Sequence, residues 1–262
     1  QRLPSSDFLC FFWQAAKVRK YKNLPRPEVG RVNKKFFDMA AKLKAVIFDL
    51  DGTLVDAYKA VERSMNYALK QAGFPKVSAH TIKRSVGWGD RQLIEGFVGR
   101  EHSPVVLDIY RRHHTESLKT GVKFLRGAQE ILIDLDRDGY ILAIASNRPT
   151  RFTKIILKIL KMDAYFDCVL CADKISRPKP YPDILKFILK KYKLRSKEAL
   201  YVGDMTIDVK TGNSARVKTV AVLTGSSTRE EISLLKPYKI IPRISHLRNV
   251  IKHIESTNKK GN

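Results

Sequence analysis

The sequence predicts an α/β fold: a Rossmann-like, doubly wound parallel sheet that forms the core, with a small α-helical cap domain inserted into it. Three short apolar runs, 45–48, 140–145 and 199–202, have the composition of buried parallel strands. Each run leads directly into a polar or charged motif. Ligands of open α/β sheets bind just beyond the carboxyl ends of the strands, so we expect these motifs to meet at one edge of the sheet.

The first strand ends in the motif Asp-Leu-Asp-Gly-Thr at 49–53. Side chains alternate along an extended chain, so Asp49 and Asp51 can lean toward one volume. Gly52 allows a sharp turn, and the Thr53 hydroxyl can donate to a phosphate oxygen or close the turn. An EF-hand calcium loop is excluded, because it needs a preceding helix and a glutamate at its twelfth position, where this chain has alanine. A solvated acidic turn is the alternative for this motif alone.

Two further motifs carry groups suited to an anion. Ser146 and Asn147 follow the strand 140–145 and offer a hydroxyl and a backbone N–H. Lys179 stands between two prolines, just before an amphipathic helix expected at 184–192. The prolines fix the backbone and keep the lysine out of the helix, which suits a positioned counter-charge. Taken alone, the lysine also fits a solvated surface turn.

The last motif places two carboxylates across a strand-to-helix turn. The strand 199–202 leads into Gly-Asp-Met-Thr-Ile-Asp at 203–208, in which Asp204 and Asp208 are four residues apart. At that spacing the carboxylates can face the same cation or the same lysine. Asp208 also fits the first turn of a helix, where an acidic side chain interacts favourably with the helix dipole.

Together the four motifs resemble the haloacid dehalogenase superfamily, and its phosphoglycolate-phosphatase-like members with a small helical cap in particular. The resemblance covers about 44–251, and 217–226 is similar to the fifth strand and following loop of those members. It implies a phosphatase in which Asp49 is the nucleophile and Asp51 the general acid, then the base. It also implies a Mg²⁺ site and a phosphoryl site. The implied Mg²⁺ ligands are Asp49, the backbone carbonyl of Asp51, and Asp204, with Asp208 as a further ligand or as a partner of the ligands. The implied phosphate-binding residues are Ser146, Asn147 and Lys179. Thr53 belongs to the implied catalytic residues.

Physical chemistry supports these implied roles. A carboxylate can attack an anionic phosphoester only if a cation and a lysine cancel the repulsion. Mg²⁺ prefers hard oxygen ligands, which fits a site rich in carboxylates. An acid at Asp51 also favours a phosphatase over the dehalogenase and phosphonate-cleaving members that the chain resembles, which have a non-acidic residue there.

The domain organisation follows from the positions of the motifs. We expect the core at 41–54 and 124–262, the helical cap at 55–123, and a basic extension at 1–40 that is disordered or not part of the fold. Met39 is a candidate start. Helical spacing of apolar residues predicts cap helices at 58–72 and 105–119.

The cap is expected to select the substrate. Its turn at 87–91 is the candidate segment, with Trp88 and Arg91 reaching the substrate and Arg91 available for a second anionic group. The alternative is that Trp88 packs inside the cap and Arg91 is solvated.

The substrate class stays open at this point. A phosphoglycolate-type or sugar-phosphate-type monoester is expected, with a pyrophosphatase or a β-phosphoglucomutase-like mutase as alternatives. The mutases of the family that this chain resembles carry a histidine near the position of Val61. No histidine occurs here between Asp49 and His80, which argues against mutase activity. Another departure is Arg216, where relatives usually have glycine.

Charge and cysteine content indicate which partners and which cellular compartment to expect. The chain has 50 basic and 26 acidic residues, a net charge of +24, which attracts anions. A nucleic-acid- or protein-binding protein on this scaffold is the alternative class, but most lysines fall on helix faces opposite apolar stripes and no nucleic-acid-binding motif is present. The 3 cysteines form no disulfide framework and predict buried thiols in the cytoplasm. No membrane association is expected, and the chain is expected to be a monomer or homodimer.

Overall fold

A computed structural model describes residues 43–260, so the expected extension at 1–40 and the candidate start at Met39 lie outside the described residues. In the described part, the main sheet has 6 strands in the order β5-β4-β1-β6-β7-β8. All neighbouring pairs are parallel, with β1 at the centre between β4 and β6. The strands are β1 (Ala45–Phe48), β4 (Ile141–Ser146), β5 (Cys168–Cys171), β6 (Ala199–Gly203), β7 (Lys218–Val222) and β8 (Lys239–Ile241).

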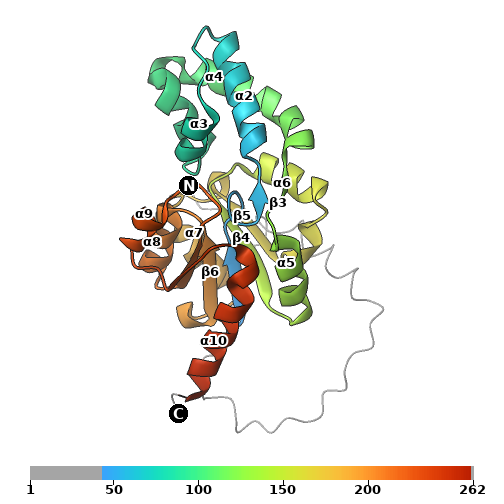
Figure 1. Cartoon of the computed structure of the whole chain (residues 1–262), viewed down its shortest axis with the longest axis vertical. Helices are drawn as coiled ribbons and strands as arrows, with labels where there is room; N and C mark the ends of the chain where they lie inside the picture. Colours follow the sequence, from blue (N-terminus) through green and yellow to red (C-terminus); the bar gives the residue numbers. More distant parts are fainter. Residues whose placement is uncertain (1–42, 261–262) are drawn as a thin grey trace, which may run out of the picture.

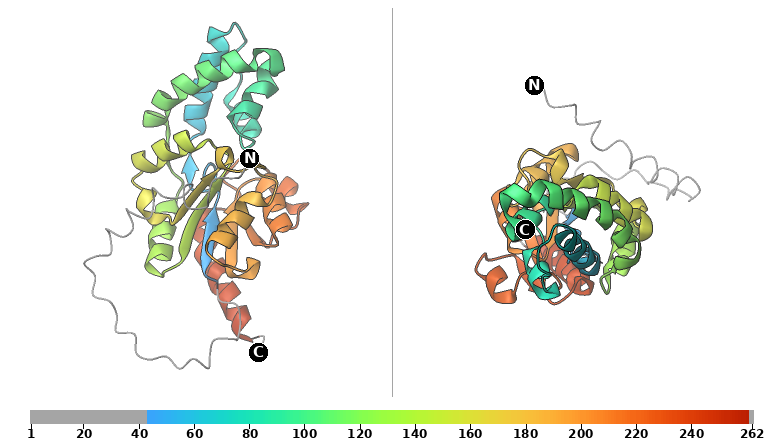
Figure 2. Two further views of the ribbon diagram at one scale, coloured as in Figure 1. Left: turned by 180° about the vertical axis from the view of Figure 1, so that it is seen from behind. Right: turned by 90° about the horizontal axis from the view of Figure 1, so that it is seen from above.

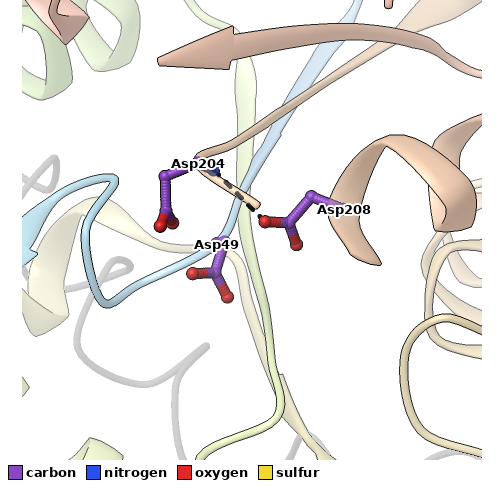
Figure 3. A group of neighbouring side chains, drawn as sticks. All are labelled: Asp49, Asp204 and Asp208. Carbon is purple, nitrogen blue, oxygen red and sulfur yellow. Dashed lines mark hydrogen bonds between the residues drawn. The ribbon is translucent and has the colours of Figure 1, made fainter. Parts of the chain in front are cut away.

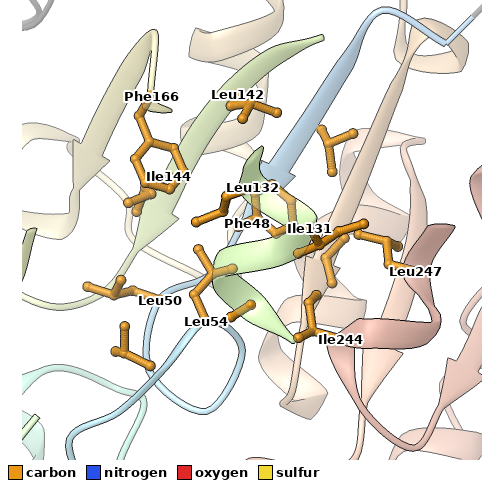
Figure 4. Close-up of a cluster of buried hydrophobic side chains, with 14 of the residues drawn as sticks. Phe48, Leu50, Leu54, Ile131, Leu132, Leu142, Ile144, Phe166, Ile244 and Leu247 are labelled. Carbon is orange, nitrogen blue, oxygen red and sulfur yellow. The ribbon is translucent and has the colours of Figure 1, made fainter. Parts of the chain in front are cut away.

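Apolar side chains alternate between the two faces of the sheet, and helices cover both. Val46 and Phe48 of β1 point into one hydrophobic cluster, and Ala45 and Ile47 into another. The first cluster, part of which is drawn in Figure 4, is closed by α5, α6 and α10, and the second by α7 and α8. This arrangement confirms the predicted doubly wound α/β fold. The helices are α5 (Ala128–Arg137), α6 (Thr150–Ile159), α7 (Asp183–Lys191), α8 (Thr206–Ala215), α9 (Arg229–Ser233) and α10 (Leu247–Lys260).

The two cysteines of β5 separate in the same way. Cys171 packs in the first cluster and Cys168 in the second, and both are buried thiols. Residues three apart in a strand point to opposite faces, so the CxxC spacing forms no pair here. The prediction of buried thiols is confirmed for these two.

Three helices, α2 (Tyr58–Gln71), α3 (Ala79–Ser85) and α4 (Asp90–Gly121), lie together at one end of the molecule (Figures 1 and 2). They share a hydrophobic cluster of their own. A short antiparallel pair, β2 (Val55–Asp56) and β3 (Lys123–Phe124), joins them to the core. We call these helices the cap; the predicted boundaries at 55–123 stay a prediction.

One cap helix differs from its predicted extent. Helical structure begins at Asp90 and continues to Gly121, whereas apolar spacing predicted a helix at 105–119. Gly99 interrupts the helix with a φ of 73°. This kink shifts the buried face, so the residues on either side do not form one continuous apolar pattern.

The residue that departs from the expected glycine, Arg216, ends α8 in the left-handed region with a φ of 57°. A left-handed residue commonly closes a helix, and glycine adopts that conformation without strain. The turn into β7 therefore forms with arginine, at a cost in backbone energy.

No helix within residues 43–260 combines the length and apolarity that crossing a membrane requires.

Candidate active site

The motifs that follow separate strands meet at the carboxyl edge of the sheet, under the cap. Asp49 follows β1, Ser146 ends β4 and Asp204 follows β6. A cavity between core and cap is lined by motif residues, among them Asp49, Asp51, Ser146 and Lys179. Parallel strands bring their carboxyl ends together, which explains why residues so distant in sequence form one site.

Three buried carboxylates form the centre of this site (Figure 3). One oxygen from each of Asp49, Asp204 and Asp208 lies within 4.8 Å of the others. Burial, and then the neighbouring carboxylates, raise the pKa of Asp204 well above its usual range. Burial also raises the pKa of Asp49 to about 7, although Lys179 acts against it. Burial and mutual repulsion therefore oppose full ionisation of these three carboxylates.

Lys179 is the cation that pairs with two of these three carboxylates. Its Nζ donates to Asp49 Oδ1 at 2.6 Å, to Asp208 Oδ1 at 2.7 Å and to the Tyr201 hydroxyl at 3.2 Å. Burial by itself lowers the pKa of Lys179, but the two carboxylates outweigh burial and hold that pKa above its usual value. The ammonium therefore stays charged beside Asp49.

The donor set fits a divalent cation. When ionised, the three carboxylates carry two more negative charges than the one ammonium compensates. The ligand atoms are hard oxygens and no thiol or imidazole belongs to the cluster, which suits Mg²⁺ rather than a softer metal.

Asp208 differs from the other two carboxylates because both its oxygens already accept hydrogen bonds. Oδ1 accepts from Lys179 at 2.7 Å and from the Tyr201 hydroxyl at 2.7 Å. Oδ2 accepts from the backbone N–H of Asp204 at 3.2 Å and of Met205 at 3.0 Å. Asp208 thus fixes both the lysine and the turn that carries Asp204.

Asp204 is held by loops on either side of it. Thr53 Oγ1 donates to Asp204 Oδ1 at 3.0 Å, and the backbone N–H of Ser226 donates to Oδ2 at 3.1 Å. Gly52 has a φ of +77°, and a Cβ on it would lie 2.6 Å from the Asp204 carboxylate. Glycine is therefore required for this close approach.

Asp51 is bound by an arginine that follows the second motif. Arg148 donates from Nε to Asp51 Oδ2 at 2.7 Å and from Nη2 to Oδ1 at 2.8 Å. Its Nη1 lies 2.9 Å from Nε2 of His114, a buried residue of the cap helix α4. A guanidinium only donates, so Nε2 accepts and the proton of the neutral ring is on Nδ1, which lies 3.1 Å from Ser64 Oγ. Burial, and then Arg148, lower the pKa of His114 to about 2.

The other residues of the second motif also connect parts of the site. Ser146 is buried, lines the cavity and accepts at Oγ from the backbone N–H of Arg148 at 3.2 Å. The Asn147 side chain accepts from the Lys179 N–H at 3.0 Å and donates to the Lys179 carbonyl at 3.1 Å. It also donates to the carbonyl of Gly87 in the cap at 3.1 Å. Its side chain thus holds the lysine loop, and a phosphate-binding role for Asn147 stays a prediction.

The expected cap turn reaches the cavity, but through other residues than expected. Gly87, Gly89 and Asp90 line the cavity, whereas Trp88 and Arg91 do not. Trp88 is 44% exposed and Arg91 is exposed. A contact of either side chain with a substrate therefore requires a different cap position from the one described.

Sequence reasoning assigned no role to three residues of the site: Tyr201, Arg148 and His114. Tyr201 lies inside an apolar strand two residues before the last motif, where a buried hydroxyl needs a polar partner. That signal could have been found. The pairing of Arg148 with His114 depends on how the cap sits on the core, which no local pattern specifies.

Comparison with known proteins agrees with this geometry. The sequence model of the haloacid dehalogenase-like hydrolases matches residues 46–222. A phosphoglycolate phosphatase of Aquifex aeolicus is 28% identical over 203 residues, which are 76% of this chain and 95% of that protein. One of Pseudomonas syringae pv. tomato is 29% identical over 218 residues, 79% of this chain and 80% of that protein. The crystal structure of a predicted phosphoglycolate phosphatase from Haemophilus somnus has a TM-score of 0.75 and 25% identity, covering 79% of this chain and 97% of that one.

The chain therefore belongs to the haloacid dehalogenase-like hydrolases. Within this family it is a phosphatase similar to the phosphoglycolate phosphatases, as the four motifs predicted.

Proposed function

We propose that the protein is a Mg²⁺-dependent phosphatase that hydrolyses a small phosphomonoester of the phosphoglycolate or sugar-phosphate type through an aspartyl-phosphate on Asp49. The observation that carries this proposal is the buried contact of Asp49 with Lys179, next to Asp204 and at the wall of the cavity. Lys179 screens the approach of an anionic phosphoryl group to Asp49. The family membership supports the same chemistry.

Asp49, Asp204 and the backbone carbonyl of Asp51 would hold Mg²⁺, which when bound supplies positive charge to the phosphoryl oxygens. Asp208 is better suited to positioning than to direct ligation, because both its oxygens are taken by Lys179, Tyr201 and backbone N–H groups. Thr53 acts on the metal site by orienting Asp204.

The reaction has two steps. The Asp49 oxygen that does not accept from Lys179 attacks phosphorus, and the P–O bond to the alcohol breaks. Asp51 gives a proton to the leaving oxygen. Asp51 then takes a proton from water as the water oxygen attacks phosphorus, and the bond from phosphorus to Asp49 breaks to release phosphate. Ser146 binds a phosphoryl oxygen in both steps, and Lys179 binds another by giving up its 3.2 Å hydrogen bond to the Tyr201 hydroxyl.

The mutase alternative receives no support from the cavity. Val61 lines it where the mutases would place a histidine, and no histidine is among the residues that line the cavity in the described part of the chain. His114 is buried and turns Nε2 toward Arg148. Transfer to a second hydroxyl of the substrate thus lacks an evident base, and hydrolysis is favoured.

Phosphate release tests the proposal. Purified protein with Mg²⁺ is given a panel of phosphomonoesters that includes 2-phosphoglycolate, sugar phosphates and p-nitrophenyl phosphate, with pyrophosphate as a competing class. We expect turnover of at least one monoester and none by the Asp49→Asn variant, which keeps the size of the side chain. Borohydride trapping during turnover should convert Asp49 to homoserine, as expected for an acyl phosphate. No release from any compound above the Asp49→Asn level would refute the proposal.

A further inference from the structure

Arg148 has hydrogen-bonding capacity that its two partners do not use. A guanidinium carries five N–H bonds. Nε and one N–H of Nη2 bind Asp51, and one N–H of Nη1 binds His114. Among residues 43–260, one N–H on each of Nη1 and Nη2 has no acceptor, although the side chain is only 8% exposed. A buried cation with spare donors at a cavity wall is suited to an incoming anion.

The other charged groups that line this cavity are already paired. All three N–H bonds of Lys179 have acceptors within hydrogen-bonding distance. Arg111 donates to Asp90 from Nε to Oδ2 at 2.7 Å and from Nη2 to Oδ1 at 2.9 Å. Arg111 itself does not line the cavity. Arg91, the cation that the sequence suggested for a second anionic group, does not line the cavity. Arg148 is thus the lining cation with unused donors.

Arg148 is also held rigidly. Two hydrogen bonds fix its plane against Asp51, and His114 fixes its far side from the cap. A pre-organised guanidinium loses little freedom when it binds an anion, and it binds planar carboxylates well. An anion on Nη1 and Nη2 does not displace Asp51, so the same residue can serve both groups.

We propose that Arg148 is the specificity-determining residue of this site and binds a second anionic group on the alcohol part of the substrate. This inference rests on the proposed function. Asp51 protonates the leaving oxygen and is in direct contact with Arg148, so the second anion lies close to that oxygen. The substrate class is therefore the phosphate ester of a short hydroxy acid.

The remaining cavity wall supports a short substrate over a sugar. Most of its lining side chains are apolar, so it offers few partners for the several hydroxyl groups of a sugar. The apolar lining residues are Val61, Val86, Leu93, Pro149, Phe152, Met205 and Ile207, and two tyrosines, Tyr58 and Tyr110, complete this part of the wall.

Selectivity between two matched esters tests the assignment. 2-Phosphoglycolate and ethyl phosphate share a two-carbon chain, and only the first has a carboxylate. We measure kcat/KM for both esters with the full chain and with Arg148→Gln, Arg148→Lys and the exposed control Arg100→Gln. Any effect of Arg148 through Asp51 lowers both rates together, so the ratio of the two values reports the anion contact. We expect Arg148→Gln to reduce the ratio roughly 10- to 100-fold. The ratio for Arg148→Lys should lie between those of the unchanged protein and of Arg148→Gln, and Arg100→Gln should leave the ratio unchanged.

Binding separates this inference from the proposed function. In the Asp49→Asn background, dissociation constants of both esters are measured by calorimetry with and without Arg148→Gln, after thermal melting has confirmed folding. A selective loss of 2-phosphoglycolate binding supports the inference even if turnover of the panel fails. An unchanged ratio in both assays would overturn it, and so would a loss of selectivity in Arg91→Gln instead.

Discussion

The buried imidazole of His114 predicts that mild acid destabilises the protein. Its pKa is about 2 in the folded chain, lowered by burial and then by Arg148, against about 6.5 for an ordinary histidine. Below pH 6.5 the unfolded chain binds a proton at this position that the folded chain does not. The stability from His114 is therefore complete above pH 6.5 and is lost as the pH falls from 6.5 toward 2.

The size of the effect follows from the two pKa values. One unit corresponds to about 1.4 kcal/mol, so the contribution lost between about pH 7.5 and pH 5 is about 2 kcal/mol. Other groups titrate in the same range. The pKa values of Asp49 and Asp204 are raised in the folded state, so their contribution to the unfolding free energy has the opposite sign. A carboxyl group whose pKa is raised on folding stabilises the folded state in acid. The difference in unfolding free energy between the protein and a His114 variant isolates the contribution of the histidine.

Urea denaturation at these two pH values provides the assay. We expect the difference in unfolding free energy between the protein and His114→Gln to change by about 2 kcal/mol, with the variant gaining relative stability at about pH 5. His80→Gln, at an exposed histidine of α3, should show no such change. The reasoning is wrong if the difference for His114→Gln is the same at both pH values.

Three further results are expected. Arg216→Gly should raise the unfolding free energy by roughly 0.5–1 kcal/mol in urea denaturation, because glycine adopts the left-handed conformation that ends α8 without strain; a loss of stability would contradict this. Gly225→Ala should lower phosphatase activity at least roughly tenfold and raise the Mg²⁺ concentration for half-maximal activity, because its Cβ would overlap the Asp204 carboxylate. Gly96→Ala, with open space around it, is the control, and equal activity of the two variants would refute the argument. Chelation with EDTA should remove turnover and Mg²⁺ should restore it, whereas turnover that persists in EDTA would exclude the proposed metal.

The residues at the carboxyl ends of strands were predictable because their placement follows from local pattern. An apolar run of four residues indicated β1, and its boundaries agree with the structure. Once three such strands are parallel neighbours, Asp49, Ser146 and Asp204 must lie at the same edge. The strand predicted at 140–145 differs from β4 by one residue at each end.

The cap was predictable as helices but not in its contacts. Helical spacing indicated α2, whereas the kink at Gly99 concealed the first part of α4. The contact of His114 with Arg148 needs the cap to sit at one particular angle on the core. That angle results from packing between two separate hydrophobic clusters, and no periodicity within one helix specifies it.

Polar contacts between cap and core involve both helices and the loop that follows Ser146. Arg84 of α3 forms an ion pair with Glu231 of α9 at 2.5 Å. Asn147 holds the carbonyl of Gly87, and Arg148 holds His114. Two of these contacts involve the residues that immediately follow Ser146, so a cap movement that breaks them also changes the surroundings of Asp51 and Lys179. The cap forms part of the cavity wall, so we expect substrate entry to involve such a movement. In the proposed enzyme, the segment 146–148 therefore links cap closure to the chemical step, and substitutions there should alter kcat and KM together.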